Sequence, residues 1–197
     1  RRTMDALKVP RVPGSAGAGK DAQEALKYAR EIKFPVLLKA AAGGGGKGMR
    51  RVDTEEELPA AFEGASRESL NAFGDGAMYV EKLILEPHHV EIQVFGDGKG
   101  GGVHLGEREC SIQRRHQKVW EESPAPILEI HPETLTRMFD CDLKIVNHVQ
   151  YAGAGTLEFI VDGKGDFYFL EMNTRLQVEH PVTEWVTGVD LVAWQLL

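Results

Sequence analysis

Two acidic residues in the last third of the chain, Glu158 and Glu171, have a spacing that could bind a metal ion. Each stands in a run of alternating apolar and polar residues, which predicts a β-strand, and the run DGKGD at 162–166 between them is typical of a hairpin turn. With Lys164 and Gly165 at the tip, Glu158 lies directly opposite Glu171 on one face of the sheet. Facing like charges destabilise a strand pair by roughly 0.2–1 kcal/mol, and a divalent cation between them would reverse that effect.

The same register, in which Asp162 faces Phe167, places Asn173 on the face of the two acids. Oxygen ligands of this kind suit Mg²⁺ or Mn²⁺, and protein-bound Mg²⁺ usually accompanies nucleotide phosphates. The hairpin therefore predicts a metal–nucleotide site. The alternative, two solvated acids on an exposed face, stays open on this stretch alone.

A glycine-rich loop is the second candidate. Residues 40–48 read AAAGGGGKG and follow a short apolar strand that ends at Lys39. Glycine backbone N–H groups can approach phosphate oxygens closely, and a lysine adds charge. The pattern is not a Walker loop, because no Ser or Thr follows Gly-Lys, and residues 49–53 predict a return strand rather than the helix of a Rossmann turn. We interpret it as a hairpin lid over phosphates, with a flexible linker as the alternative.

The third candidate is cationic. In an extended chain Arg114, His116 and Lys118 share one face, and such a row suits an anion bound in a cleft. A solvated charged strand edge is the alternative, and composition does not decide between them.

Composition bounds the class of protein. The chain has 197 residues, enough for one substantial core or two small lobes, and its net charge of −7 argues against nucleic acid as the main partner. Cys110 and Cys141 have neither a disulfide framework nor metal-ligand spacing, so a reducing compartment is expected. No apolar run reaches the ~18 residues of a membrane span, and the start has no secretory signal pattern. The first residue is Arg rather than Met, which suggests a part of a longer protein.

The elements that must position these groups form two predicted lobes. Residues 1–13 read as a linker rich in Pro and Gly that leads into a small lobe of strands and helices at 14–83. The first helix of that lobe is capped by Asp21 and ends before Pro35. Pro59 lies awkwardly in the second turn of the next helix, where it should cost a hydrogen bond.

Residues 84–197 predict the larger lobe. A strand at 90–94 has an apolar inner face, a return strand covers 103–112, and a helix covers 132–151. The predicted buried side of this helix consists of Leu135, Met138, Phe139, Leu143 and Val146. The fold class is therefore α+β, with the hairpin at 156–173 completing the sheet.

Four longer stretches of the chain are distinctive when taken together. They read AAAGGGGKGMR, YVEKLILEPHHVEIQVFGDG, GERECSIQRRHQKVWEESPAP and FLEMNTRLQVEHPVTE. They resemble the biotin carboxylase component of biotin-dependent carboxylases, a member of the ATP-grasp superfamily. The resemblance covers nearly the whole chain, and it implies an ATP-grasp fold in which a small lid lobe and a larger antiparallel sheet hold ATP.

The resemblance also implies which residues bind ATP. Lys39 would contact phosphate and the adenine end, and Gly45 and Gly46 would close over the phosphates. Glu81, Lys82 and Ile84 would hold adenine. The ribose and its phosphates would be reached by His89, Gln113 and His116.

Metal and bicarbonate residues follow in the same way. Glu158, Glu171 and Asn173 fall on the family's Mg²⁺ (or Mn²⁺) ligands, which agrees with the hairpin argument. The bicarbonate site would consist of Lys118, Arg175, Gln177, the backbone of Val178, and Glu179. Of these, Lys118, Arg175 and Glu179 would be catalytic. Glu179 would act as general base, and Arg175 would offer a bidentate fork to the anion.

The implied activity is ATP- and bicarbonate-dependent carboxylation of biotin through carboxyphosphate, as part of an acyl-CoA or pyruvate carboxylase. The implied partners are a biotin carboxyl carrier domain and a carboxyltransferase, with a homodimer of the full-length enzyme. The location would be cytoplasm or mitochondrial matrix, with no nucleic acid and no membrane as partner. Because the family's catalytic unit is longer than this chain, an ATP- and Mg²⁺-binding fragment without carboxylation activity is the main alternative. Another ATP-grasp ligase, such as one like carbamoyl-phosphate synthetase, is a further alternative.

Overall fold

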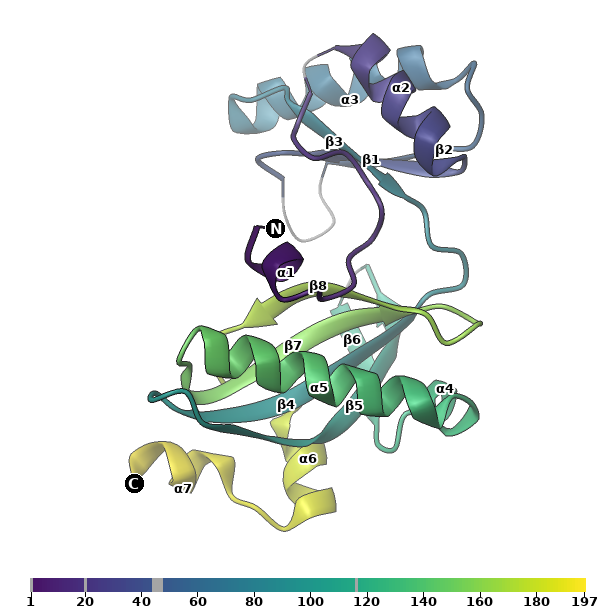
Figure 1. The fold of residues 1–197 in the computed structure, drawn as a ribbon. Helices are drawn as coiled ribbons and strands as arrows, with labels where there is room; N and C mark the ends of the chain where they lie inside the picture. The colour runs from purple at the N-terminus through teal and green to yellow at the C-terminus, as the bar shows by residue number, and fades with distance from the viewer. Residues whose placement is uncertain (1, 20, 44–47, 116) are drawn as a thin grey trace. The chain divides into compact units, whose positions relative to one another are not determined.

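The computed structural model describes residues 2–19, 21–43, 48–115 and 117–197. Gly45, Gly46 and His116, which are implied to bind ATP, lie outside the described residues. The chain divides into two compact units, one of residues Val12–Ile84 and one of residues 2–11 with Leu85–Leu197 (Figure 1). Each unit has its own hydrophobic core.

The smaller unit is a three-stranded antiparallel sheet covered by two helices. Its elements in chain order are α2 (Ala22–Ile32), β1 (Val36–Ala40), β2 (Met49–Val52), α3 (Leu58–Phe73) and β3 (Met78–Lys82), with the strand order β2-β1-β3. As predicted, the Asp21 side chain caps α2, accepting a hydrogen bond from the Gln23 N–H at 2.8 Å. The predicted return strand after the glycine-rich loop is confirmed as β2, which pairs with β1 from Val36↔Val52 to Lys39↔Met49.

Pro59 does not interrupt a helical turn. Helix α3 begins at Leu58 with Glu57 as its N-cap residue, so Pro59 lies within the first two helical positions. A backbone N–H in the first turn has no partner inside the helix, so proline costs no hydrogen bond there. The prediction of an awkward proline was wrong because it placed the start of the helix too early.

The larger unit is a five-stranded antiparallel sheet with the strand order β6-β5-β4-β7-β8 (Figure 1). Its strands are β4 (His88–Asp97), β5 (Gly102–Arg114), β6 (Gln117–Glu122), β7 (Ala152–Val161) and β8 (Phe167–Asn173). Its helices are α1 (Arg2–Ala6), α4 (Pro126–Ile130), α5 (Pro132–His148), α6 (His180–Thr187) and α7 (Leu191–Leu196).

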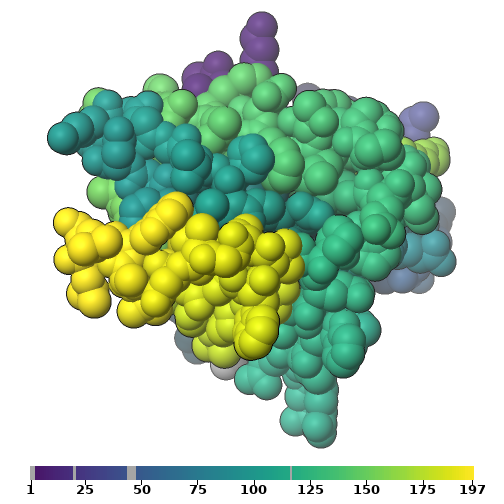
Figure 2. All heavy atoms as spheres, turned by 90° about the horizontal axis from the view of Figure 1, so that it is seen from below, coloured from purple at the N-terminus to yellow at the C-terminus, as the bar shows by residue number. Residues whose placement is uncertain are grey.

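Helices cover both faces of this sheet. Val90, Ile92 and Val94 of β4 are fully buried in the core that α5 shares. The alternate residues Glu91 and Gln93 are also fully buried, but they face the side on which α6 packs against β5. Figure 2 shows the C-terminal segment in yellow lying against strands β4 and β5 in teal. A buried polar layer therefore separates the sheet from α6.

The first residues belong to this unit rather than to a linker. Residues 2–6 form α1, and Val9 is 5% exposed within the larger core. The Phe169 N–H donates to the Pro10 carbonyl at 2.8 Å, which adds a short parallel bridge beside β8. Residues 2–11 of the segment predicted as a linker thus pack with the larger unit, through apolar burial and one edge contact.

Helix α5 carries an acid on its buried side. Met138 and Val146 are fully buried as predicted, and so is Asp142, which the apolar pattern did not include. Within the described residues neither Asp142 oxygen has a hydrogen-bond partner. Burial raises the pKa of Asp142 well above its usual range, because the surroundings disfavour the charged form.

Replacing Asp142 by Ala is expected to stabilise the protein. An unpaired buried polar group costs about 1–3 kcal/mol, so the free energy of unfolding at pH 7 should rise by about that amount. A raised folded-state pKa means that the wild type loses stability as pH rises above about 3.8, the ordinary value. The advantage of the variant should therefore shrink as pH falls toward 4.

Denaturant unfolding at several pH values measures this effect. The matched control is Asp140→Ala, which removes an exposed acid from the same helix and should change stability little. A D142A protein less stable than wild type at pH 7 would show that Asp142 has a stabilising partner.

Candidate functional site

The β7–β8 hairpin places Glu158 directly opposite Glu171, and this predicted pairing is confirmed. The route to it differs from the prediction. Val161, rather than Asp162, lies opposite Phe167, and the register shifts between Glu158 and Phe159. The turn is one residue longer than predicted, and β8 contains one bulge residue. The two shifts cancel, so Glu158 still lies opposite Glu171.

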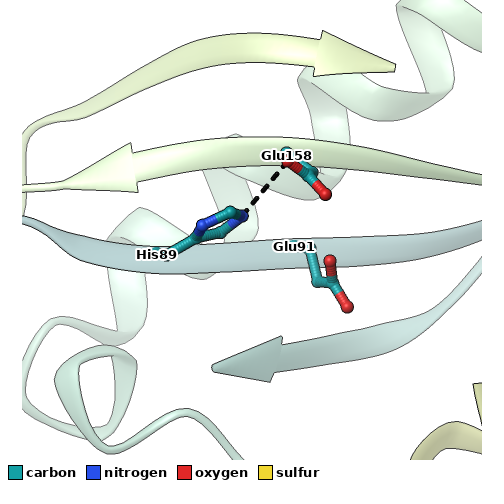
Figure 3. Close-up of side chains that lie close together, drawn as sticks. All are labelled: His89, Glu91 and Glu158. Atoms are coloured by element: carbon teal, nitrogen blue, oxygen red, sulfur yellow. Dashed lines mark ion pairs between the residues drawn. The ribbon is translucent and has the colours of Figure 1, made fainter. Parts of the chain in front are cut away.

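The two acids have different surroundings. Glu171 is exposed, whereas Glu158 is 7% exposed and accepts hydrogen bonds from the Lys118 Nζ and the Asn173 Nδ2, both at 2.9 Å. Its other oxygen lies 3.3 Å from the His89 Nε2 (Figure 3). Burial opposes ionisation, but the adjacent His89 ring and the hydrogen bond from Lys118 outweigh it and lower the pKa of Glu158 to about 2. The sequence predicted a cation because two facing carboxylates repel each other. In the structure, His89, Lys118 and Asn173 already stabilise the charge of Glu158.

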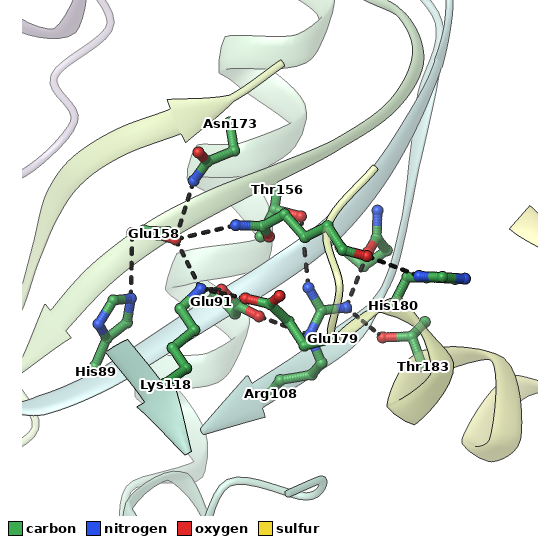
Figure 4. A network of polar contacts seen from close by, with 12 residues as sticks. His89, Glu91, Arg108, Lys118, Thr156, Glu158, Asn173, Glu179, His180 and Thr183 are labelled. Carbon is green, nitrogen blue, oxygen red and sulfur yellow. Dashed lines mark hydrogen bonds and ion pairs between the residues drawn. The ribbon is translucent and has the colours of Figure 1, made fainter. Parts of the chain in front are cut away.

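Lys118 joins three carboxylates at the centre of this group (Figure 4). From β6 its Nζ reaches Glu91 at 2.5 Å, Glu158 at 2.9 Å and Glu179 at 2.5 Å. Although burial disfavours its charged form, these acids raise the pKa of Lys118, which stays protonated. One ammonium group therefore links the acid of the hairpin to an acid at the start of α6.

The predicted cationic row does not form among the described residues. A turn with a positive φ at Arg115 joins β5 to β6, and Gln113 pairs with Lys118 while Arg114 pairs with Gln117. Directly opposed residues share a face and successive residues alternate, so Arg114 and Lys118 lie on opposite faces. Arg114 is exposed, and Lys118 faces the acids. The prediction failed because it assumed one continuous strand.

The segment after β8 contributes Gln177 and Glu179. Gln177 is 9% exposed, and its Nε2 donates to Glu158 at 3.3 Å. Glu179 is the N-cap residue of α6. Burial disfavours its ionised form, but the hydrogen bond from Lys118 and further positive charge lower the pKa of Glu179. Arg175 and Val178 are exposed on the same segment, and Val178 keeps 93% of its surface accessible.

The predicted ATP residues fall in both units. In the larger one, the Gln113 Nε2 lies 2.9 Å from the His89 Nδ1, so these two side chains meet. In the smaller one, the Lys39 Nζ donates to Glu81 at 3.0 Å. The Lys82 side chain instead donates to the Lys33 and Phe34 carbonyls, at 3.0 and 3.1 Å. Ile84 is the last residue of that unit.

Sequence reasoning missed Glu91 and Arg108 as members of this group. Both are fully buried, and the Arg108 Nε donates to Glu91 at 2.7 Å. The available signal was the polar face of the predicted strand, with His89, Glu91 and Gln93 at alternate positions. A wholly polar face on a strand whose other face is apolar indicates a buried polar site or solvent, and only the packing of α6 distinguishes the two.

Of the two predicted acidic metal ligands, Glu158 but not Glu171 belongs to a cluster of described side chains close enough together to hold one cation. Ligand atoms of His89, Glu91 and Glu158 lie within 4.8 Å of one another (Figure 3). On the neighbouring strand, Asn173 pairs with Thr156 and Glu171 with Glu158, so both lie on the same face. Two carboxylates and an amide oxygen are hard oxygen ligands, which suit Mg²⁺ or Mn²⁺.

Fold and site together define a class. The chain belongs to the family described as the carbamoyl-phosphate synthase L chain, ATP binding domain, which matches residues 1–197. Its relatives include biotin carboxylases and the alpha chains of acyl-CoA carboxylases. It is 52% identical over 196 residues to biotin carboxylase 2 of Bacillus subtilis, covering 100% of this chain and 44% of that protein. It is 54% identical over 192 residues to the propionyl-CoA carboxylase alpha chain of Ruegeria pomeroyi, covering 98% of this chain and 28% of that one.

Solved structures of biotin carboxylases have the same fold as this chain. The biotin carboxylase–βγ-ATP complex from Campylobacter jejuni matches with a TM-score of 0.89 and 52% identity, covering 99% of this chain and 43% of that one. The biotin carboxylase domain dimer of Hydrogenobacter thermophilus 2-oxoglutarate carboxylase, in complex with MgADP, ADP and bicarbonate, matches with a TM-score of 0.87, 52% identity and coverage of 99% and 43%. The resemblance to biotin carboxylases and the α+β ATP-grasp fold are therefore confirmed. The chain spans less than half the length of these relatives.

Of the helices in the described part of the chain, none combines the length and the apolar character needed to span a bilayer.

Proposed function

We propose that this chain is the ATP-binding core of an ATP- and bicarbonate-dependent biotin carboxylase. The observation that carries the proposal is the position of Lys118, which bridges Glu158 and Glu179. Glu158 is a proposed metal ligand, and Glu179 is the proposed base for bicarbonate. A lysine between them can bind an anion placed beside a metal-bound phosphate.

Glu158, Glu171 and Asn173 would hold Mg²⁺ or Mn²⁺, which neutralises charge on the phosphates during phosphoryl transfer. On the larger unit, His89 and Gln113 contact each other and would bind the ribose and its phosphates. On the smaller unit, Lys39 and Glu81, which are ion-paired, would bind the phosphate and adenine groups together with Lys82 and Ile84. Gly45, Gly46 and His116 complete the proposed ATP set.

The chemistry proposed for Glu179 is proton transfer. A bicarbonate oxygen attacks the γ-phosphorus of ATP, ADP leaves, and the bicarbonate proton passes to Glu179, giving carboxyphosphate. The lowered pKa of Glu179 means that the carboxylate is ionised at neutral pH and has a free site for that proton, while the contact with Lys118 reduces its basicity. Lys118, Arg175, Gln177 and the Val178 backbone would hold the anion. The exposed guanidinium of Arg175 can offer it a bidentate contact.

The later steps follow from the same intermediate. Carboxyphosphate breaks down to CO₂ and phosphate, the phosphate removes the proton from biotin N1′, and the resulting enolate attacks CO₂. Biotin would arrive on a carboxyl carrier domain, and a carboxyltransferase would pass the carboxyl group to an acyl-CoA or keto acid. Relatives include bacterial and mitochondrial proteins, which supports a cytoplasmic or matrix location, and the dimeric relative supports a homodimer.

Bicarbonate-dependent ATP cleavage, measured with and without free biotin, tests the proposal. Stimulation by both compounds is the expected result. ATP binding without any turnover would instead favour the second candidate, an ATP- and Mg²⁺-binding fragment that is inactive alone. That candidate is supported by the chain's coverage of 44% of Bacillus subtilis biotin carboxylase 2.

Replacing Glu171 by Gln is expected to raise the Mg²⁺ requirement. Even groups that only support a metal ligand change metal affinity by about 10–100-fold, so losing a charged ligand should raise the half-saturating Mg²⁺ concentration at least tenfold. Titrating Mg²⁺ in the ATP-cleavage assay, or in calorimetry with ATP, measures this. Glu129→Gln, which changes an exposed acid on α4, is the matched control. Unchanged metal dependence in E171Q would remove Glu171 from the metal site.

A further inference from the structure

Arg108 is a fully buried charged group beside the proposed site, as is its partner Glu91. The exposed fraction of Arg108 is 0%, and it lies in the middle of β5. Its guanidinium donates to Glu91 at 2.7 Å, to Gln93 at 2.8 Å and to Thr183 at 2.7 Å (Figure 4). These partners come from β4 and α6, so one side chain joins the sheet to the helix that starts at the proposed base.

The first branch of this network leads to Lys118. Glu91 is fully buried and shares its two oxygens, one with Arg108 and the other with Lys118. Three acids surround Lys118, and Arg108 is the cation that balances one of them. Without Arg108 the charge of Glu91 would fall wholly on Lys118, and the group would carry one more uncompensated negative charge. Both effects would weaken the binding of a small anion at Lys118.

The second branch leads to Glu179. Thr183 is 2% exposed, lies in α6, and accepts the hydrogen bond from Arg108. Glu179 is the N-cap residue of that helix and meets Lys118 at 2.5 Å. The bond between Arg108 and Thr183 therefore sets the position of α6 relative to the sheet, and through it the position of the Glu179 carboxylate.

We infer that Arg108 is a positioning residue for bicarbonate. It balances the charge of Glu91, so that Lys118 can bind the anion, and it anchors α6, so that the Glu179 carboxylate lies beside the bound anion. This inference rests on the proposed function. Arg108 is fully buried among protein groups. Its effects are transmitted through Glu91 and Thr183.

The test is steady-state kinetics of ATP cleavage in Arg108→Met and Arg108→Lys, with bicarbonate and ATP varied separately. Loss of a hydrogen bond to a charged group corresponds to about 10–100-fold, so we expect the KM for bicarbonate to rise by that factor in R108M. The KM for ATP should stay within about twofold. R108K keeps the charge without the fork and should lie between R108M and wild type. Arg114→Met, which changes an exposed arginine of the same strand, should leave both constants unchanged.

A purely structural role would give another pattern. It would lower the fraction of active protein, measured by nucleotide titration, while leaving the KM for bicarbonate unchanged, and that result overturns the inference. If R108M does not fold, R108K and Thr183→Val decide. Thr183→Val removes only the helix branch and should lower kcat more than it raises the KM for bicarbonate. Wild-type kinetics of both variants overturn the inference. A wild-type protein without bicarbonate-dependent cleavage overturns the proposed function as well.

Discussion

Glu179→Gln is expected to lower bicarbonate-dependent ATP cleavage by about 10²–10⁴-fold, the usual contribution of a general base. The amide keeps the size of the side chain but cannot accept the bicarbonate proton. The contact of Lys118 with Glu179 should weaken without a new cavity. ATP affinity should stay near the wild-type value, because Glu179 is proposed to act only on bicarbonate.

Turnover and nucleotide binding must be measured separately for this variant. Calorimetry with a non-hydrolysable ATP analogue and Mg²⁺ gives the affinity, and phosphate release with saturating bicarbonate gives the rate. Glu129→Gln on α4 controls for the loss of one acid. An equal loss of ATP affinity in E179Q would assign Glu179 to the nucleotide rather than to proton transfer.

Lys118→Met is expected to lower the free energy of unfolding by about 3–5 kcal/mol, the usual effect of removing one partner from a buried ion pair. The lysine is 16% exposed at its side chain, and its partners Glu91, Glu158 and Glu179 are 0–9% exposed at theirs. Methionine preserves the aliphatic stem but leaves three buried acids with less positive charge. Bicarbonate-dependent turnover should be lost as well.

The pH dependence of stability should reverse in this variant. In the wild type the folded pKa of Glu158 is about 2, below its ordinary 4.5, so its contribution to stability is present above pH 4.5 and is lost as pH falls toward 2. Burial raises the pKa values of Glu158 and Glu179, and Lys118 lowers them. Without Lys118, the effect of burial is less opposed and both pKa values should rise. The difference in stability between wild type and K118M should therefore increase as pH rises from 4.5 to 8.

Denaturant unfolding with a chelator present measures this difference without bound metal. Lys144→Met, on the exposed side of α5, is the matched control and should change stability little at any pH. A constant difference between wild type and K118M across this pH range would mean that Lys118 does not hold these acids ionised.

The hairpin was predictable because it is local. Alternation along 156–161 and 167–173 is enough to predict two strands, and a short loop between them forces an antiparallel pair. Glu158 and Glu171 were therefore paired correctly even though the turn and the bulge were not foreseen. Helix ends were predicted with mixed success. Asp21 caps α2 as expected, but the start of α3 was placed too early relative to Pro59.

What failed were the inferences that depended on a turn or a spatial neighbour that the local pattern does not show. The row of Arg114, His116 and Lys118 assumed one extended strand, but the turn at Arg115 sends Lys118 to the opposite face. Asp142 interrupts the apolar stripe of α5 and is buried all the same, because the helix presents its whole inner surface to the sheet. No local pattern distinguishes that acid from an exposed one.

The sequence by itself determined the facing acids of the hairpin and the resemblance to biotin carboxylases, since each depends on residues close together along the chain. The tertiary structure alone decided that Lys118 meets Glu179, 61 positions away, and that Arg108 meets Thr183, 75 positions away. These contacts depend on strand order and on α6 folding back over the sheet. The chemistry of Lys118 and Arg108 depends on the groups that they contact, and tertiary packing decides which groups those are.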